Sequence, residues 1–248
     1  MLIKVTANYE GDYSPQHNKD VMLLGKPILF NTEMVQAILE DRKNCTRRII
    51  KRTPSNDEPC GYGFWKDYNE DDKRWYIKDY THACVWWTLE EYISKFSKYH
   101  VGDILYVRET WMMQSMSNFD KKAKFLFKAK PNERLKEVIL SSDRYEDLIK
   151  YSSKNGWKPS LFMPKEAARI FLKITDVRIE KLHDMTRTDA TKEGFKDDDK
   201  LNNKGELLTS LGNFSRLWNT TIKKEQFKMY SWDANPWVWV IEFERVKK

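Results

Sequence analysis

The chain has 248 residues, enough for one large domain with a sizeable core, and Lys and Arg outnumber Asp and Glu by 44 to 37. The formal charge of +7 favours an anionic partner, with nucleic acid first, and no run of about eighteen apolar residues predicts a membrane span. Three widely spaced cysteines (Cys45, Cys60 and Cys84) argue against a disulfide framework or a zinc site, so we expect a cytoplasmic protein with no metal, cofactor or membrane partner.

The first elements follow from apolar spacing. Residues 26–30 predict a short strand, after which Asn31 or Thr32 can cap a helix that carries Met34, Val35, Ile38 and Leu39. Ile49 and Ile50 predict a second strand, which Pro54 would end. The N-terminal residues 1–5 lack a long apolar segment, so we expect no secretory signal.

Residues 53–100 have the character of an insertion rich in aromatic residues. Residues 61–64 predict a turn, and residues 74–77 and 83–87 predict two short strands around a turn near Asp79. A short helix is expected from Leu89 to Lys98.

The remaining chain alternates strands and single helices. Strands are predicted at residues 104–111, 125–129, 170–179 and 237–246. Residues 131–154 are charged and locally helical, residues 164–168 form a helical turn, and residues 196–204 are a charged loop. Helices are predicted from Asp184 or Thr186 to Gly194 and over residues 207–220. Single helices between short strands favour an α+β fold, with a small mixed β-barrel decorated by helices.

Residues 42–48 concentrate charge and hydroxyl chemistry directly after the first predicted helix. Lys43 and Thr46 lie three positions apart, among Arg42, Arg47 and Arg48. A lysine can act as a base toward a threonine when neighbouring cations lower its pKa, and the two side chains would share a face if this turn were helical. A polar helix end that leads into a basic loop is the simpler interpretation of the spacing alone.

Four stretches together give the chain a family likeness: residues 38–48 (ILEDRKNCTRR), 101–105 (VGDIL), 189–194 (DATKEG) and the final WVIEF-like strand. This pattern resembles the ASCH family of the PUA-like superfamily. Residues 102–111, 157–160 (WKPS) and 232–237 (WDANPW) are most similar to the larger phage and prophage ASCH-related proteins. The likeness implies one domain over residues 1–248, with a core at about 26–52 and 101–246 and insertions at about 53–100 and 130–155.

The resemblance also implies a chemistry, namely hydrolysis of the acetyl amide of N4-acetylcytidine. By motif, the catalytic residues fall on Lys43 as base, Thr46 as nucleophile or activator of water, and Glu193 as the group that holds the proton or positions water. The residues expected to line a cleft for a modified nucleoside or a nucleic-acid base are Arg42, Arg47, Arg48, Arg108, Glu109 and Trp111.

Other functions fit the same residues. The chain could be a non-catalytic RNA- or DNA-binding module of phage origin, with RNA the first expectation, or a ribonuclease, in the cytoplasm of a bacterium or a phage-infected host. Lys43 could be a solvated charge, Thr46 a strand residue and Glu193 an ion-pair partner of an arginine, while Cys45 is expected to be a small buried hydrophobe.

Overall fold

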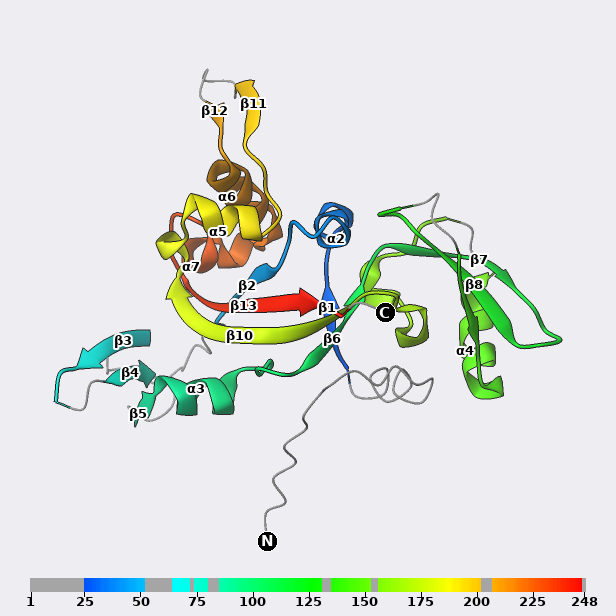
Figure 1. The fold of residues 1–248 in the computed structure, drawn as a ribbon, viewed down its shortest axis with the longest axis horizontal. Helices are drawn as coiled ribbons and strands as arrows, with labels where there is room; N and C mark the ends of the chain where they lie inside the picture. The colour runs from blue at the N-terminus through cyan, green and yellow to red at the C-terminus, as the bar shows by residue number, and fades with distance from the viewer. Residues whose placement is uncertain are drawn as a thin grey trace, which may run out of the picture. The chain divides into compact units, whose positions relative to one another are not determined.

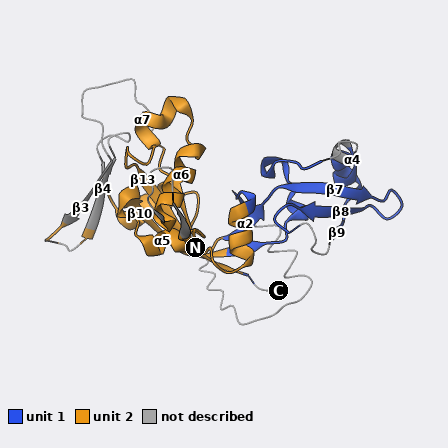
Figure 2. Ribbon diagram, turned by 90° about the horizontal axis from the view of Figure 1, so that it is seen from above, with its two compact units in different colours: residues 1–32, 104–172, 246–248 blue, residues 33–103, 173–245 orange. Residues whose placement is uncertain are grey.

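The computed structural model describes residues 25–51, 64–71, 74–79, 85–130, 135–152, 156–201 and 207–246. The chain forms two compact units, distinguished by colour in Figure 2. Unit 1 contains residues 1–32, 104–172 and 246–248, and unit 2 contains residues 33–103 and 173–245. In the described part of the chain, no helix combines the length and the apolar character needed to cross a bilayer.

The fold is α+β, as the sequence predicts, and its largest sheet has the strand order β1-β6-β10-β13-β2 (Figure 1). These strands are β1 (Lys26–Leu29), β6 (Ile104–Arg108), β10 (Phe171–Lys181), β13 (Trp237–Arg245) and β2 (Cys45–Ile49). The sheet is mixed, because β1 runs parallel to β6 and β13 runs antiparallel to β2.

Unit 1 is built on a three-stranded antiparallel sheet with one buried face. Its strands are β7 (Trp111–Met116), β8 (Lys122–Phe127) and β9 (Lys136–Ile139), and the helix α4 (Ser142–Ser152) follows them. Ala123, Phe125 and Phe127 alternate with partly exposed residues along β8, as expected for a half-buried strand. Their buried face joins Tyr145 and Leu148 of α4 in one core cluster. Short 3₁₀ turns, η1 (Ser160–Phe162) and η2 (Lys165–Ala167), complete this part of the chain.

Unit 2 covers its sheet strands with different elements on each face. On one face, Cys45, Val238 and Val240 pack against Phe214 and Trp218 of α6. On the other face, Trp239 stacks on Tyr92 of α3 at a ring separation of 6.0 Å. Figure 1 shows the helices α5, α6 and α7 on the first side of β10 and β13, and α3 with β3–β5 on the second. The helices named here are α2 (Thr32–Leu39), α3 (Leu89–Phe96), α5 (Arg187–Lys192), α6 (Ser210–Thr221) and α7 (Phe227–Tyr230). The remaining strands are β3 (Phe64–Asn69), β4 (Arg74–Asp79), β5 (Val85–Thr88), β11 (Asp198–Leu201) and β12 (Leu207–Leu208). The 3₁₀ turns are η3 (Leu182–Asp184) and η4 (Lys224–Gln226).

Most elements with a strong periodic pattern are confirmed, including α2, β6, β10 and β13. The aromatic strands of the insertion are also confirmed as β4 and β5, which pair antiparallel, but β3 begins where a turn was expected at Phe64. Three predictions are wrong: residues 136–139 form β9 rather than helix, residues 198–201 form β11 rather than loop, and residues 207–208, predicted to begin a helix, form β12. Pairing with neighbouring strands determines these short strands, and no local pattern encodes it. Pro54, Cys60, Cys84, the turn predicted at residues 61–63 and the first two residues of the strand predicted at 83–87 lie outside the described residues.

Helix α5 has a defined beginning and end. Thr186 and Asp189 form a reciprocal capping box at its N-terminus. At its C-terminus, the Phe195 amide donates to the Ala190 carbonyl and the Gly194 amide to the Thr191 carbonyl, which is the Schellman pattern. Gly194 has a φ of +97°, and a Cβ there would lie 2.7 Å from the Cβ of Ala37 in α2. The helix thus ends at Gly194 for two reasons, backbone conformation and close approach.

We expect Gly194→Ala to lower the free energy of unfolding by about 2–4 kcal/mol, because a left-handed alanine and an overpacked Cβ both destabilise. Gly102 is the matched control, since it also has a positive φ (+89°) and belongs to unit 2, yet a Cβ there meets nothing within 4 Å. Gly102→Ala should therefore lower the free energy of unfolding only by the cost of the left-handed backbone, about 1–2 kcal/mol. Urea denaturation measures both variants, and equal losses would show that the approach to Ala37 is not limiting.

Candidate functional site

Lys43 and Glu193, predicted to act together, form a buried ion pair. Lys43 is 3% and Glu193 2% exposed, and Nζ lies 2.6 Å from Oε2. The two backbones also form an isolated antiparallel bridge, and the Asn44 amide donates to the Lys192 carbonyl. The chain between α2 and β2 is therefore joined to the end of α5 through main chain and side chains.

The Lys43 ammonium has three acceptors around it. Nζ donates to the Glu193 carboxylate, to the Glu193 carbonyl at 3.0 Å and to the Cys45 carbonyl at 2.7 Å. A lysine ammonium carries three N–H donors, so this arrangement matches its protonated form. Burial lowers the pKa of the Lys43 amine from its ordinary value, and the Glu193 carboxylate opposes that shift.

Arg47 holds the second oxygen of the same carboxylate. Its Nη1 lies 3.4 Å from Glu193 Oε1, and its Nη2 lies 3.4 Å from Glu180 Oε2 and 3.9 Å from Asp189 Oδ2. Arg47 is itself only 3% exposed. Two cations and a carboxylate thus share one buried position, with two partly exposed carboxylates at its edge.

Thr46 does not join this cluster. Residues 45–49 form β2, so the backbone after Lys43 is extended where a helical turn was considered. Side chains alternate between faces along a strand, which places Cys45 and Arg47 on the face of α5 and α6, and Thr46 and Arg48 on the opposite face. The pairing agrees, because Arg48 is opposite Trp239, which packs on α3.

Cys45 and Arg48 are shaped by burial. Burial raises the pKa of the Cys45 thiol to about 12, and the side chain packs with Val238 and Val240, which confirms the prediction of a small buried hydrophobe. On the other face, burial lowers the pKa of the Arg48 guanidinium, while Tyr99 opposes that shift. The Cys45 thiol is therefore protonated at neutral pH, and Arg48 lies on the face of β2 away from the Lys43–Glu193 pair.

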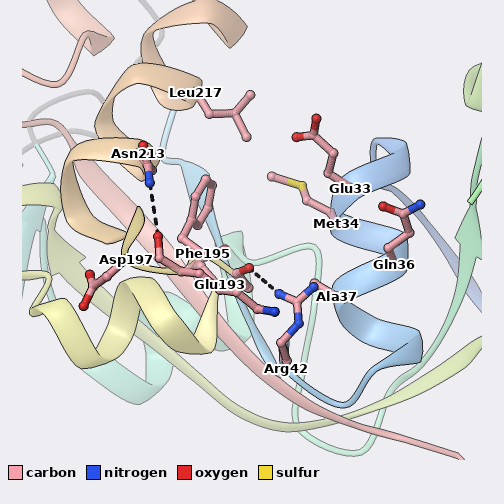
Figure 3. A pocket seen from close by; sticks show the side chains of 12 residues that line it. Glu33, Met34, Gln36, Ala37, Arg42, Glu193, Phe195, Asp197, Asn213 and Leu217 are labelled. Carbon is pink, nitrogen blue, oxygen red and sulfur yellow. Dashed lines mark hydrogen bonds between the residues drawn. The ribbon is translucent and has the colours of Figure 1, made fainter. Parts of the chain in front are cut away.

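A cavity of about 720 Å³ opens beside the ion pair in unit 2 (Figure 3). Its walls come from α2, from the loop that follows α5, and from α6. The lining residues are Glu33, Met34, Gln36, Ala37, Arg42, Glu193, Gly194, Phe195, Lys196, Asp197, Asn213 and Leu217.

The centre of this cavity is apolar and its margin is polar. Figure 3 shows the Phe195 ring below the Leu217 side chain, with the Met34 side chain to its right. Arg42 enters from below, with its Nη1 donating to the Gly194 carbonyl at 2.7 Å and its Nη2 2.6 Å from Glu40. Arg42 is the predicted binding arginine that lines the cavity, whereas Arg47 is buried behind Glu193.

Three of the predicted binding residues, Arg108, Glu109 and Trp111, belong to unit 1. Glu109 is 1% exposed and forms a two-point ion pair with Arg169, at 2.8 and 3.0 Å. Arg108 Nε donates to the Met163 carbonyl, and Trp111 is fully buried beside Phe125. In unit 1 these residues stabilise the interior and its surroundings, and their predicted role in ligand binding stays a prediction.

Sequence reasoning did not identify Phe195, Gln36 or Asn213 as candidate ligand contacts. Gln36 follows Val35 on α2, and Asn213 belongs to α6, so each has the appearance of an ordinary polar helix residue. Phe195 carried one usable signal, its position directly after the helix-ending Gly194. An apolar residue at this position commonly packs against apolar neighbours, and the Phe195 ring meets the ring of Phe214 in α6 edge to face, with the centroids 5.5 Å apart.

We expect Glu193→Gln to lower the free energy of unfolding by about 3–5 kcal/mol, because two buried cations lose their shared counter-charge. Glu225→Gln is the matched control, since Glu225 is exposed in the same unit and should tolerate the same change. The double variant Lys43→Met/Glu193→Gln should lose less than the sum of the single variants, which urea denaturation in a double-mutant cycle can measure. A loss for Glu193→Gln no larger than the control would contradict the ion-pair account.

Comparison of the chain with protein-family models, with curated proteins and with solved structures gives no match.

Proposed function

We propose that unit 2 binds a modified nucleoside or a nucleic-acid base in the cavity beside the Lys43–Glu193 pair, on an ASCH-type, PUA-like scaffold. The cavity carries the proposal: its volume of about 720 Å³ lies within the range of small-molecule sites. The barrel expected of that scaffold is part of the same proposal, supported by the mixed sheet and by the motifs at residues 38–48 and 189–194.

The lining suits a flat heterocycle with polar edges. A base ring has two apolar faces, and Phe195, Met34 and Leu217 offer apolar surface for them. Gln36 and Glu33 supply amide and carboxylate groups for the edge of a base, and the Arg42 guanidinium supplies donors for a carbonyl or a phosphate. Several hydrogen-bonding side chains around one apolar centre favour a ligand with polar edges over a purely apolar one.

The ion pair gives this site its rigidity. Glu193 and Gly194 both line the cavity, and Lys43 and Arg47 fix Glu193 from behind. A wall held by buried charges loses little conformational freedom when a ligand enters, and such preorganisation favours affinity.

We expect Phe195→Leu to weaken nucleoside binding by roughly 5- to 150-fold, the equivalent of one stacked base lost at about 1–3 kcal/mol. Leucine keeps the site apolar but removes the ring face. Titration calorimetry with N4-acetylcytidine and cytidine, chosen after a thermal-shift screen, measures the change. Phe227→Leu is the matched control, because Phe227 is an exposed phenylalanine of α7 outside the cavity lining. Unchanged affinity in Phe195→Leu would remove this ring from the site.

Amide hydrolysis of an N4-acylated cytosine is the second candidate, and the lowered pKa of Lys43 is the observation that favours it. A neutral amine can take a proton from water as water attacks the carbonyl carbon, and the proton can then pass to the leaving amine. Because Thr46 lies on the other face of β2, the attacking group in this proposal is water. The three acceptors around Nζ favour the protonated amine, so binding alone remains the first proposal.

Under the second candidate, wild-type protein converts N4-acetylcytidine to cytidine and acetate, Lys43→Met does not, and Thr46→Val retains the wild-type rate. Threonine and valine have nearly the same shape, so Thr46→Val removes only the hydroxyl. Chromatography of the products measures the rate, with circular dichroism to confirm folding. Loss of activity in Thr46→Val would restore a catalytic role to its hydroxyl. If the wild-type protein binds N4-acetylcytidine but releases no cytidine, binding alone is its function.

A further inference from the structure

The positive charge of the protein is concentrated in unit 1. Unit 1 has nineteen Lys and Arg against eleven Asp and Glu, a net charge of +8, whereas unit 2 has twenty-five against twenty-six, a net charge of −1. Within unit 1, residues 121–130 (KKAKFLFKAK) contain five lysines and no acidic residue. This run forms β8, the central strand of the three-stranded sheet, and its continuation.

The sheet of unit 1 has one face in the core and one outer face. The register places Lys122, Lys124 and Leu126 on the outer face of β8, opposite Ile139, Glu137 and Met112 respectively. The side chains of Lys122 and Lys124 are 36% and 44% exposed, and Ile139 is 72% exposed. The inner face, with Phe125 and Phe127, is the one that joins α4 in the core.

Exposed aromatic rings lie near both ends of β7. Lys158 forms an isolated bridge with Trp111 and is buried, so alternation places the neighbouring Trp157, 40% exposed, on the outer face beside Met112. At the other end of β7, Phe119 is fully exposed in the turn that leads into β8. The strand between them spans roughly 17 Å, at about 3.3 Å per residue.

We infer that the outer face of the unit 1 sheet binds a single-stranded nucleic acid. Lysines along β8 would neutralise successive phosphates, and Trp157 and Phe119 would each stack an unpaired base. Charge complementarity selects this occupant, because the charged residues of β8 are both lysines and exposed rings lie near both ends of β7. The inference is independent of the proposed nucleoside cavity, which belongs to unit 2.

The acidic partners on this face do not close it to phosphate. Lys122 lies 3.3 Å from Glu137 and from Asp120, and Lys124 lies 3.5 Å from Glu137. Exposed ion pairs of this kind are weak and screened by salt, so these lysines can exchange a carboxylate for a phosphate.

The test is fluorescence anisotropy with labelled single-stranded RNA and DNA of twelve nucleotides, using the full chain. Wild type should bind both the single-stranded RNA and the single-stranded DNA, with an affinity that falls steeply as the salt concentration rises. It should bind the matching duplex more weakly, because the bases of a duplex are already stacked. Lys122→Gln/Lys124→Gln should reduce the slope of log affinity against log salt by roughly 1.4, at about 0.7 per phosphate contact. Trp157→Ala should weaken binding by roughly 5- to 150-fold.

Lys223→Gln/Lys224→Gln is the matched control, because it removes the same charge from exposed lysines of unit 2 and should leave the salt slope near wild type. Equal losses in the two double variants would overturn the inference in favour of diffuse attraction. No binding by wild type, or duplex bound as tightly as single strand with Trp157→Ala unchanged, would also overturn it. Dimers that dissociate on Trp157→Ala would show that a second copy covers the face instead. Nucleoside titration of unit 2 can fail without changing any of these results.

Discussion

The burial of the Glu193 carboxylate is the constraint on which the rest of unit 2 depends. Glu193 is the C-cap residue that follows α5, directly before the turn at Gly194, and Lys43 and Arg47 reach its two oxygens from either end of a five-residue stretch. A charge removed from water is tolerated only with close partners, so the end of α5 must stay against the beginning of β2. The loop after Gly194, which supplies Phe195 and Asp197 to the cavity, starts from that fixed point.

The alternation of β2 separates residues that are contiguous in the sequence. Lys43 and Arg47 meet Glu193 at the end of α5, and Cys45 packs on the α6 side. Thr46 and Arg48 lie on the opposite face of β2, where Arg48 is opposite Trp239. A reaction that used both Lys43 and Thr46 would therefore have to approach the strand from two faces. Binding in the cavity needs only the first face, and this is the physical reason why the geometry favours it.

The sequence predicted the elements whose signals are local. The apolar spacing of α2 and the alternation of β10 are complete within each segment, and Thr186 with Gly194 marks both ends of α5. The short strands β9 and β11 were missed because their pairing depends on residues elsewhere in the chain.

The candidate site was predictable in part for the same reason. Lys43 and Glu193 are 150 positions apart, and no periodicity connects them, so only the motif resemblance placed both in one site. The structure brings these two together, while the extended backbone after Lys43 directs Thr46 elsewhere. Phe195 was missed because its role depends on the approach of α2 across Gly194, which only the tertiary structure reveals.

The net charge of +7 favours a nucleic-acid partner for the whole chain, but this charge does not lie in unit 2, which contains the cavity. Unit 2 is close to neutral, and two of its described arginines are held by carboxylates: Arg47 by Glu193 and Glu180, and Arg178 by Asp176, Glu180 and Glu242. Recognition there has to rely on shape and on hydrogen bonds to the cavity lining, which salt screens less than attraction between distant charges. Attraction over a distance belongs to unit 1, where β8 concentrates lysines. Salt should therefore weaken the binding of a nucleic-acid backbone to β8 and change the binding of a base in the cavity little, and that difference assigns each binding event to its unit.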